Sequence, residues 1–149
     1  MAKKALFISV AELKKKSIID GNVDSDKLLQ FVEVAQDTHI QNYLGTDLYN
    51  KLQTLIVDAE INDVGNAVYL TLLDSYVKPM LIWYSQATIL PFLLFQVKNG
   101  GIYKHSSENA ETINKDELDY IIQRTRDNAE FYTKRYLDCL LYTSPSPRD

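Results

Sequence analysis

Apolar residues recur at intervals of three and four along most of this chain, and this spacing predicts amphipathic helices. The pattern is clearest from Asp24 or Ser25 to about Leu44, and again after Asn114. In the first of these helices, Glu33, Gln36, Asp37 and Gln41 fall largely outside the apolar face. The two predicted core faces comprise Leu28, Phe31, Val32, Ala35, His39 and Tyr43, and Leu118, Ile121, Ile122, Thr125, Ala129, Tyr132 and Tyr136.

Capping residues mark two further helices. Ser9 and Glu12 have the spacing of a capping box, which predicts a short helix from Val10 to Lys16. Gly45 suits the end of the helix that runs to about Leu44, because glycine tolerates positive φ, and Thr46 can cap a new helix directly after it. The apolar stripe of the helix after Thr46 is Leu48, Leu52, Leu55 and Ile56.

The stretch from Tyr69 to Lys98 is the most apolar of the chain. It has no charge between Lys78 and Lys98, and its prolines, Pro79 and Pro91, predict kinks or breaks. We expect one long helix from Ala67 to Lys98 as the hub of the core. A membrane span would have a similar length, but the polar residues within the stretch and the lack of a second span favour a core helix.

Two polar segments separate these helices: an exposed acidic linker, Asp58 to Asn66, and a long irregular segment, Asn99 to Ile113. The five glycines all fall at predicted boundaries, and no alternating strand pattern is convincing. The sequence therefore predicts an all-α fold: a compact bundle of about five helices around a long, proline-kinked, central apolar helix.

Composition and motifs give no sign of catalysis. The 149 residues carry a net charge of -4, an ordinary globular balance. The N-terminal apolar run leads into charged residues rather than a cleavage site, which argues against a signal peptide. Asp37 and His39 are two apart on a helix and so do not face each other, and Asp116, Glu117 and Asp119 suit a helix start. We expect no enzyme activity, no cofactor and no metal site.

The last eleven residues, CLLYTSPSPRD from Cys139 to Asp149, differ in composition from the helix before them. Alternating serine and proline prevent a helix from continuing there. A disordered tail is the ordinary interpretation. The string also resembles translated read-through of a sequencing adapter, so we expect one native domain, residues 1–138, followed by a non-native tail, residues 139–149, with the native C-terminus missing.

Several longer motifs resemble a known family. They are FISVAELKKKSIIDGNVD, HIQNYLGTDLYNKL, YVKPMLIWYSQATILPFLLFQVKNGGIY and RDNAEFYTKRYLD. Together they resemble the head–tail connector proteins (head-completion or adaptor proteins) of tailed phages, in particular those of crAss-like gut phages. The resemblance covers roughly Leu6 to Asp138, and QNYLGTDLYNKL and NGGIY are its most distinctive parts.

The resemblance implies a non-enzymatic virion protein, made in the host cytoplasm, that forms a homo-oligomeric ring beneath the portal. The ring would extend the DNA channel and dock the tail or stopper proteins. Candidate contacts are the basic cluster Lys14, Lys15 and Lys16, the acidic residues Asp58, Glu60 and Asp63, and the loop residues Ile102, Tyr103 and Lys104.

Two other classes remain open. The basic residues Arg124, Arg126, Lys134 and Arg135 on the last helix suit a small helical nucleic-acid-binding or DNA-packaging accessory protein. Asp127 and Glu130 interrupt them, which weakens that interpretation. The charge-free stretch would suit a membrane-associated helical protein.

Overall fold

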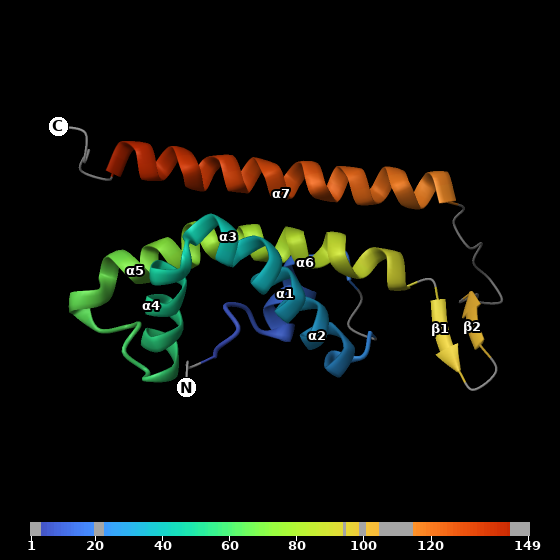
Figure 1. The fold of residues 1–149 in the computed structure, drawn as a ribbon, viewed down its shortest axis with the longest axis horizontal. Coiled ribbons are helices and arrows are strands. Elements are labelled where there is room, and N and C mark those ends of the chain that lie inside the picture. The colour runs from blue at the N-terminus through green and yellow to red at the C-terminus, as the bar shows by residue number, and fades with distance from the viewer. Residues whose placement is uncertain (1–3, 20–22, 94, 99–100, 105–114, 144–149) are drawn as a thin grey trace.

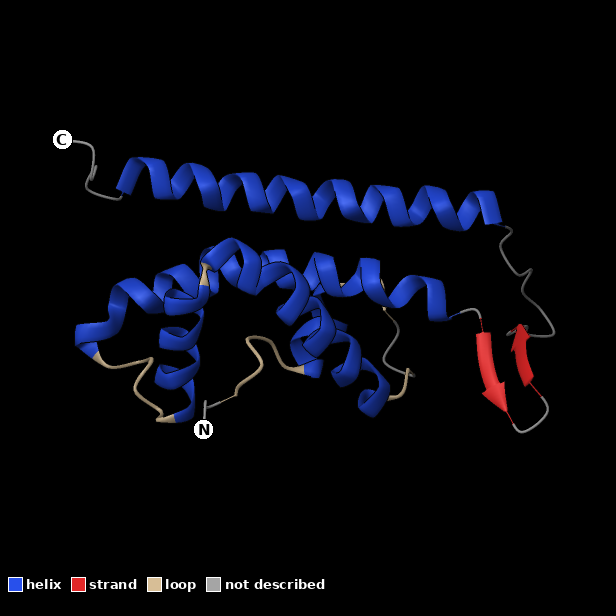
Figure 2. Ribbon diagram, in the orientation of Figure 1, coloured by secondary structure: helices blue, strands red, loops and turns tan. Residues whose placement is uncertain are grey.

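The computed structural model describes residues 4–19, 23–93, 95–98, 101–104 and 115–143. These residues form a helical bundle with one small hairpin at its end (Figures 1 and 2). The elements are α1 (Val10–Lys16), α2 (Ser25–Ala35), η1 (Gln36–Ile40), α3 (Gln41–Leu44), α4 (Thr46–Val57), η2 (Val64–Asn66), α5 (Ala67–Leu72), η3 (Leu73–Val77), α6 (Lys78–Leu93), β1 (Phe95–Lys98), β2 (Gly101–Lys104) and α7 (Lys115–Thr143).

The all-α prediction is confirmed, and so is the count of about five helices. Two of the described helices are continuous through a π-helical segment: α2, η1 and α3 form one, and α5, η3 and α6 form another. With α1, α4 and α7 these make five helical bodies. The sequence pattern did not indicate either π segment, because a single extra residue in a turn scarcely alters a spacing of three and four.

The two prolines of the central helix lie where its regular geometry changes. Pro79 is the second residue of α6, directly after the π segment η3, and Pro91 is two residues from the end of α6. In η3 the amide of Lys78 donates to the carbonyl of Leu73, five residues back. A π segment is a known way for a helix to accommodate a local disturbance. The chain stays helical through both prolines rather than breaking.

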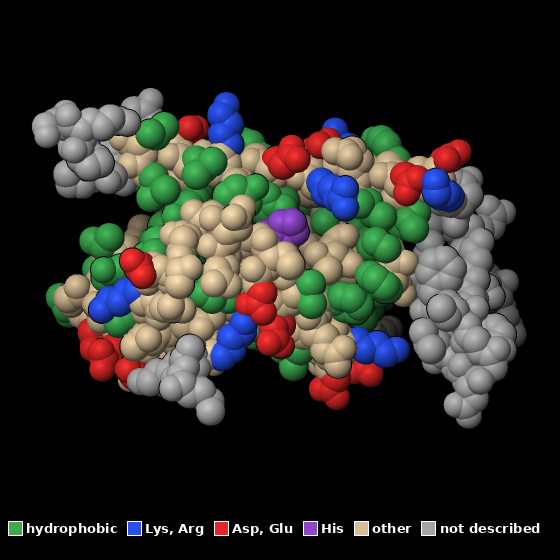
Figure 3. Space-filling model, in the orientation of Figure 1, with side chains coloured by type: hydrophobic (Ala, Val, Ile, Leu, Met, Phe, Trp, Pro, Cys, Tyr) green, Lys and Arg blue, Asp and Glu red, His purple; other side chains and the backbone are tan. Residues whose placement is uncertain are grey.

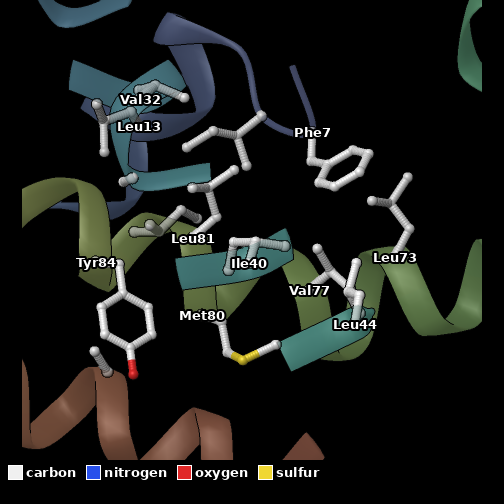
Figure 4. Close-up of a cluster of buried hydrophobic side chains, with 14 of the residues drawn as sticks. Phe7, Leu13, Val32, Ile40, Leu44, Leu73, Val77, Met80, Leu81 and Tyr84 are labelled. Carbon is white, nitrogen blue, oxygen red and sulfur yellow. The ribbon is translucent and has the colours of Figure 1, made fainter. Parts of the chain in front are cut away.

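The central helix is the hub that the sequence predicts. Helix α6 packs along α7 on one side and against α2 and η1 on the other (Figure 1). Most of its side chains are buried, including Met80, Leu81 and Ile89 with no exposed surface. Figure 4 shows this core, in which residues of the N-terminal segment, α1, α2, η1, α3, η3 and α6 meet. Both faces of α6 are therefore covered by other helices.

The end of the central helix differs from the prediction. Helix α6 ends at Leu93 rather than Lys98, and Phe95–Lys98 is a strand that pairs antiparallel with Gly101–Lys104. The register joins Lys98 to Gly101 and Phe95 to Lys104. Part of the segment expected to be irregular is thus a strand, while residues 105–114 lie outside the described residues. Pro91 and the two glycines that follow favour this early ending, because proline disturbs the helix and glycine suits a hairpin turn.

The first helices begin as predicted, with one exception. Ser9 and Glu12 form the capping box of α1, and Asp24 caps α2 through the amide of Asp26. Gly45 has φ +80°, the left-handed region that glycine tolerates. Thr46 is not a cap, however: it is the first residue of α4, and Gly45 occupies the cap position without a side-chain bond.

The N-terminal segment Lys4–Ile8 is neither helix nor strand, bends at Phe7 and Ile8, and is held by side chains rather than by a sheet. The amide of Phe7 donates to Oε1 of Gln36 at 2.8 Å, and Nε2 of Gln36 donates to the carbonyl of Ala5 at 2.8 Å. Gln36 also donates to the hydroxyl of Tyr49 at 3.1 Å and has no exposed surface. The sequence placed Gln36 outside the core face; the structure corrects this, because its amide satisfies backbone groups of a distant segment.

The last helix runs beyond the expected domain end. Helix α7 includes Cys139 to Thr143, so a helix does continue into the first residues of the segment that was expected to lack one. These residues precede the first proline of that segment, Pro145, and the helix ends before it. The predicted buried face of α7 is confirmed for Thr125, Ala129 and Tyr136, which are buried, and for Tyr132, which packs against the core. The earlier residues of that face, Leu118, Ile121 and Ile122, are only half-buried.

Candidate interaction surfaces

The acidic linker forms an exposed corner between α4 and α5. Asp58, Glu60 and Asp63 are all exposed, as the sequence predicts. Its backbone is fixed by a tight turn, in which the amide of Glu60 donates to the carbonyl of Leu55 at 2.8 Å. Nδ2 of Asn66 donates to the carbonyl of Glu60 at 2.8 Å and ties the end of the corner back to its start. The acidic groups are therefore presented on a defined turn.

Two valines stand out beside this acidic corner. Val64 is 95% exposed and Val68 is 79% exposed. Val64 begins the 3-10 turn η2 and Val68 lies in the first turn of α5, so both belong to the same corner. Neither exposure was predicted, because a valine in a linker and a valine at the start of an apolar helix both resemble ordinary packing residues. The corner thus combines carboxylates with exposed apolar surface.

The predicted basic cluster divides into two parts. Lys15 and Lys16, in the last turn of α1, are exposed. Lys14 is half-buried, and its ammonium donates to the hydroxyl of Ser25 at 3.2 Å. Lys14 therefore tethers α1 to the start of α2, which leaves Lys15 and Lys16 as the exposed charges of the cluster.

The predicted contact residues of the loop lie on a strand. Ile102, Tyr103 and Lys104 belong to β2, opposite Val97, Gln96 and Phe95 of β1. The hairpin stands at the end of the bundle where α6 finishes (Figures 1 and 2). The structure therefore places the three groups of candidate residues on separate elements: α1, the α4–α5 corner and β2.

A cleft of about 400 Å³ lies between the N-terminal segment and the α4–α5 corner. Its apolar lining includes Leu6, Ile61 and Leu70, and its charged end holds Glu12 and Lys78. The ammonium of Lys78 lies 3.1 Å from Glu12 and 3.3 Å from Asp74. Burial alone would raise the pKa of Glu12, but the bonds from Lys78 and the Ser9 amide outweigh it and lower the pKa. Glu12 and Lys78 therefore both stay ionised at this end of the cleft.

A second hollow, of about 570 Å³, lies where α7 meets η1, α3 and α6. His39 lines it and stacks on Tyr84, with ring centroids 4.1 Å apart and planes within 10° (Figure 3 shows the imidazole at the surface). Burial, and then the nearby charge of Arg126, lower the pKa of His39. Burial raises the pKa of Tyr84 to about 12, while its hydroxyl shares a hydrogen bond of 3.0 Å with Thr133. Both rings are therefore neutral at pH 7.

The basic residues of α7 that were candidates for nucleic-acid binding have different surroundings. Arg126 and Glu130 line the hollow together, whereas Arg135 lies over the ring of Tyr76 at 5.2 Å. The basic residues of α7 thus do not form one uninterrupted positive face.

Within the described part of the chain no group of three or more His, Cys, Asp or Glu side chains is placed to hold a metal ion. Nor does any described helix combine the length and apolar character that crossing a membrane requires.

Residues 40–146 match the family DUF6712, which is described as a family of unknown function. The match covers well over half of the chain, so the protein belongs to this family. It spans α4, α5, α6, the hairpin and α7, and it reaches into the segment that follows Asp138. No curated protein and no solved structure matches the chain.

Proposed function

We propose that this member of the DUF6712 family is a structural protein of a tailed-phage particle. In this proposal it is a head–tail connector without enzymatic activity, and its copies form a ring beneath the portal. The ring extends the channel for DNA and presents a surface on which tail or stopper proteins dock. The motifs QNYLGTDLYNKL and NGGIY support the proposal through their resemblance to connector proteins.

The structural observation that carries the proposal is the amount of large apolar surface outside a well-filled core. Val64, Val68, Phe92 and Leu141 are each more than half exposed, although the core of the same molecule is tightly buried. Single exposed apolar residues are normal, but two that are as exposed as Val64 and Val68 at one corner favour a site of protein contact. A subunit that is covered by neighbours in a particle needs such surfaces.

The position of these residues suits a subunit with more than one neighbour. Val64 and Val68 lie at the α4–α5 corner, whereas Phe92 lies in the last turn of α6, at the opposite end of the continuous helix that begins with α5. A ring contact is heterologous, which means that one surface of a subunit binds a different surface of the next. Two separate surfaces on one subunit meet that requirement.

The test is reconstitution with the portal protein of the same virus, followed by native mass spectrometry and electron microscopy. We expect a ring of this protein bound to one end of the portal. A protein that stays monomeric at every concentration and has no affinity for the portal would overturn the proposal.

The isolated protein also tests the alternative function, a nucleic-acid-binding or DNA-packaging accessory protein. A DNA-binding accessory protein would bind a DNA duplex with an affinity that falls steeply as salt increases. A channel subunit lets DNA pass without holding it, so we expect no measurable binding near physiological salt. Tight, salt-dependent binding by the isolated protein would favour the alternative.

A further inference from the structure

The hairpin β1–β2 is poorly supported by the rest of the molecule. Beyond its own pairing, its principal contact among the described elements is that of β1 with the adjoining end of α6. Figure 2 shows the two strands standing beside the bundle rather than on it. A two-stranded hairpin alone is marginally stable in water. Something outside the described elements is therefore needed to stabilise it.

The register shows which backbone groups have no partner within the hairpin. Two residues join the strands, so the pair Lys98 and Gly101 is hydrogen-bonded, and hydrogen-bonded pairs alternate with non-bonded ones. Gln96 and Tyr103 form the next bonded pair. The amides and carbonyls of the alternate residues face outward, away from the other strand. These residues are Phe95 and Val97 on β1, and Ile102 and Lys104 on β2.

Exposed apolar surface adjoins the base of the hairpin. Phe92, three residues before β1, is 58% exposed even though its ring stacks on Phe31 at 5.1 Å. Val34, on the same helix as Phe31, is 49% exposed. A strand that paired with the hairpin would lie beside this surface, so backbone pairing and apolar burial favour a partner in one place.

We propose that the outward edge of β1 in one copy pairs with the outward edge of β2 in the next copy. The hairpin has two different edges, so this contact is heterologous and repeats around a ring. The inference rests on the proposed function in one respect, because it names the contact between ring subunits. Its structural basis, the two edges that have no strand partner among the described residues, is independent of what the ring does.

Rotational symmetry makes a second copy the natural occupant. Rotation about a ring axis keeps the strand directions of each hairpin, so the order around the ring is β1, β2, β1, β2, with directions that alternate. Every junction between copies is then antiparallel, like the pairing inside the hairpin itself. A closed ring of strands also leaves no free edge, which removes the tendency of edges to pair with unrelated chains.

Short strands limit the strength of any one junction. Each strand has four residues, and in two of them the backbone amide and carbonyl face outward. A junction between two copies therefore has few hydrogen bonds and is weak. Closing a ring makes the last contact intramolecular, and the effective concentration then strengthens the whole assembly. We therefore expect few small oligomers and a cooperative transition from monomer to ring.

The experiment uses two proline variants of the full chain, Val97→Pro and Ile102→Pro. Each removes one outward amide and leaves the bonded pairs of the hairpin intact. Val97→Pro blocks the β1 edge and Ile102→Pro blocks the β2 edge. Gln96→Pro is the matched control, since it removes an inward amide and dismantles the hairpin. Native mass spectrometry over a range of concentrations reports the oligomers, and thermal unfolding checks that the bundle remains folded.

We expect the unsubstituted protein to form oligomers larger than a dimer and each proline variant alone to be monomeric. A mixture of Val97→Pro and Ile102→Pro retains one free edge of each kind, so its largest species should be a heterodimer, populated only at high concentration because one junction is weak. Gln96→Pro should pair with neither. A monomeric unsubstituted protein, a variant that assembles alone, or a mixture that assembles beyond a dimer would each overturn the proposal.

Adding the portal protein separates this inference from the proposed function. Oligomers that depend on both edges but never bind the portal would leave edge pairing in place and refute the connector proposal. Equal binding of the unsubstituted protein and both proline variants as portal-attached rings would refute edge pairing and support the connector proposal.

Discussion

Two non-helical segments of this protein are stabilised in opposite ways. The N-terminal segment Lys4–Ile8 has no strand partner, yet Gln36 bonds its backbone, and Phe7 and Ile8 are buried in the core. The hairpin β1–β2 has a strand partner but lies beside the bundle, where its main contact is with α6. The first segment belongs to the subunit, whereas we assign the second to the assembly.

The difference shows how a non-helical segment can be held in place without a sheet. Lys4 forms an ion pair with Asp37, and the hydroxyl of Tyr49 donates to the same carboxylate at 2.8 Å. Gln36 binds the backbone of the segment, and Asp37 binds the side chain of Lys4 at its start. An unpaired buried backbone group is costly, so this set of side chains is essential for the position of the segment.

The largest effect should come from the aromatic side chain that anchors the N-terminal segment. Phe7 is 2% exposed and contacts the ring of Tyr49 edge-on at 5.4 Å. Phe7→Ala should lower the free energy of unfolding by about 3–5 kcal/mol. Phe131→Ala, at a ring that is 63% exposed, should change it by less than about 0.5 kcal/mol. Similar losses in chemical denaturation would contradict the burial described for Phe7.

The next effect concerns the amide that holds the backbone of that segment. Gln36→Ala leaves the Phe7 amide without a partner and the Ala5 carbonyl with only the 3.4 Å bond from Gln53, and it should cost about 2–3 kcal/mol. Gln30→Ala, at an exposed glutamine of the same helix, should cost less than about 0.5 kcal/mol. Hydrogen exchange adds a local measurement: the Phe7 amide should lose protection in Gln36→Ala, whereas that of Leu81 in α6 should lose much less.

A smaller effect should appear as acid sensitivity at the hollow between α7 and its neighbours. The lowered pKa of His39 means that the unfolded chain binds a proton more readily than the folded protein. Its contribution to stability is complete above the unfolded pKa of about 6.5 and is lost as pH falls towards the folded pKa. Tyr43, Tyr84, Arg126 and Glu130 also line the hollow.

The measurement for His39 is unfolding by denaturant at pH 7 and at pH 5, in the unsubstituted protein and in His39→Gln. The loss of stability on acidification should be smaller in the variant, since carboxylates contribute to both proteins equally. An identical loss in both would show that His39 titrates as it does in the unfolded chain.

The smallest effect should come from a buried hydroxyl without a partner. Ser85 has no exposed surface, and its Oγ has no hydrogen-bond partner within the described residues. Ser85→Ala should leave stability unchanged or raise it by less than about 1 kcal/mol. Thr133→Val is the matched change, because the Thr133 hydroxyl bonds to Tyr84, and it should cost about 1 kcal/mol.

Local patterns in the sequence were enough to predict most of the helices. Spacing of apolar residues gave the buried faces of α2 and α7, and the cap at Ser9 gave the start of α1. Gln36 was missed because its partners are Ala5, Phe7 and Tyr49, and no local pattern reveals a contact across such separations. The hairpin was missed because FQVK continues an apolar run, which helix and strand share.

The candidate surfaces were predicted less completely. Exposure of Asp58, Glu60 and Asp63 follows from their polar surroundings, and it is confirmed. The partial burial of Lys14 and the exposure of Val64 depend on tertiary contacts that sequence spacing does not contain. Which of these surfaces meets a neighbour or the portal stays a prediction, which the reconstitution experiments test.

The π segments η1 and η3 have a consequence for insertions and deletions. Each holds one more residue per turn than an α-helix, and each lies inside a long helix rather than at its end. Removing one residue there, such as Asp74, would let the chain close into regular α-helix while α6 keeps nearly the same face towards α7, because the wide turn already absorbs the extra residue. The same deletion in a regular turn of α6 would rotate the residues after it by about 100° and turn their buried face away from α7. The π segments are therefore where this fold best tolerates the loss of one residue, and the regular turns of α6 are where it tolerates that loss least.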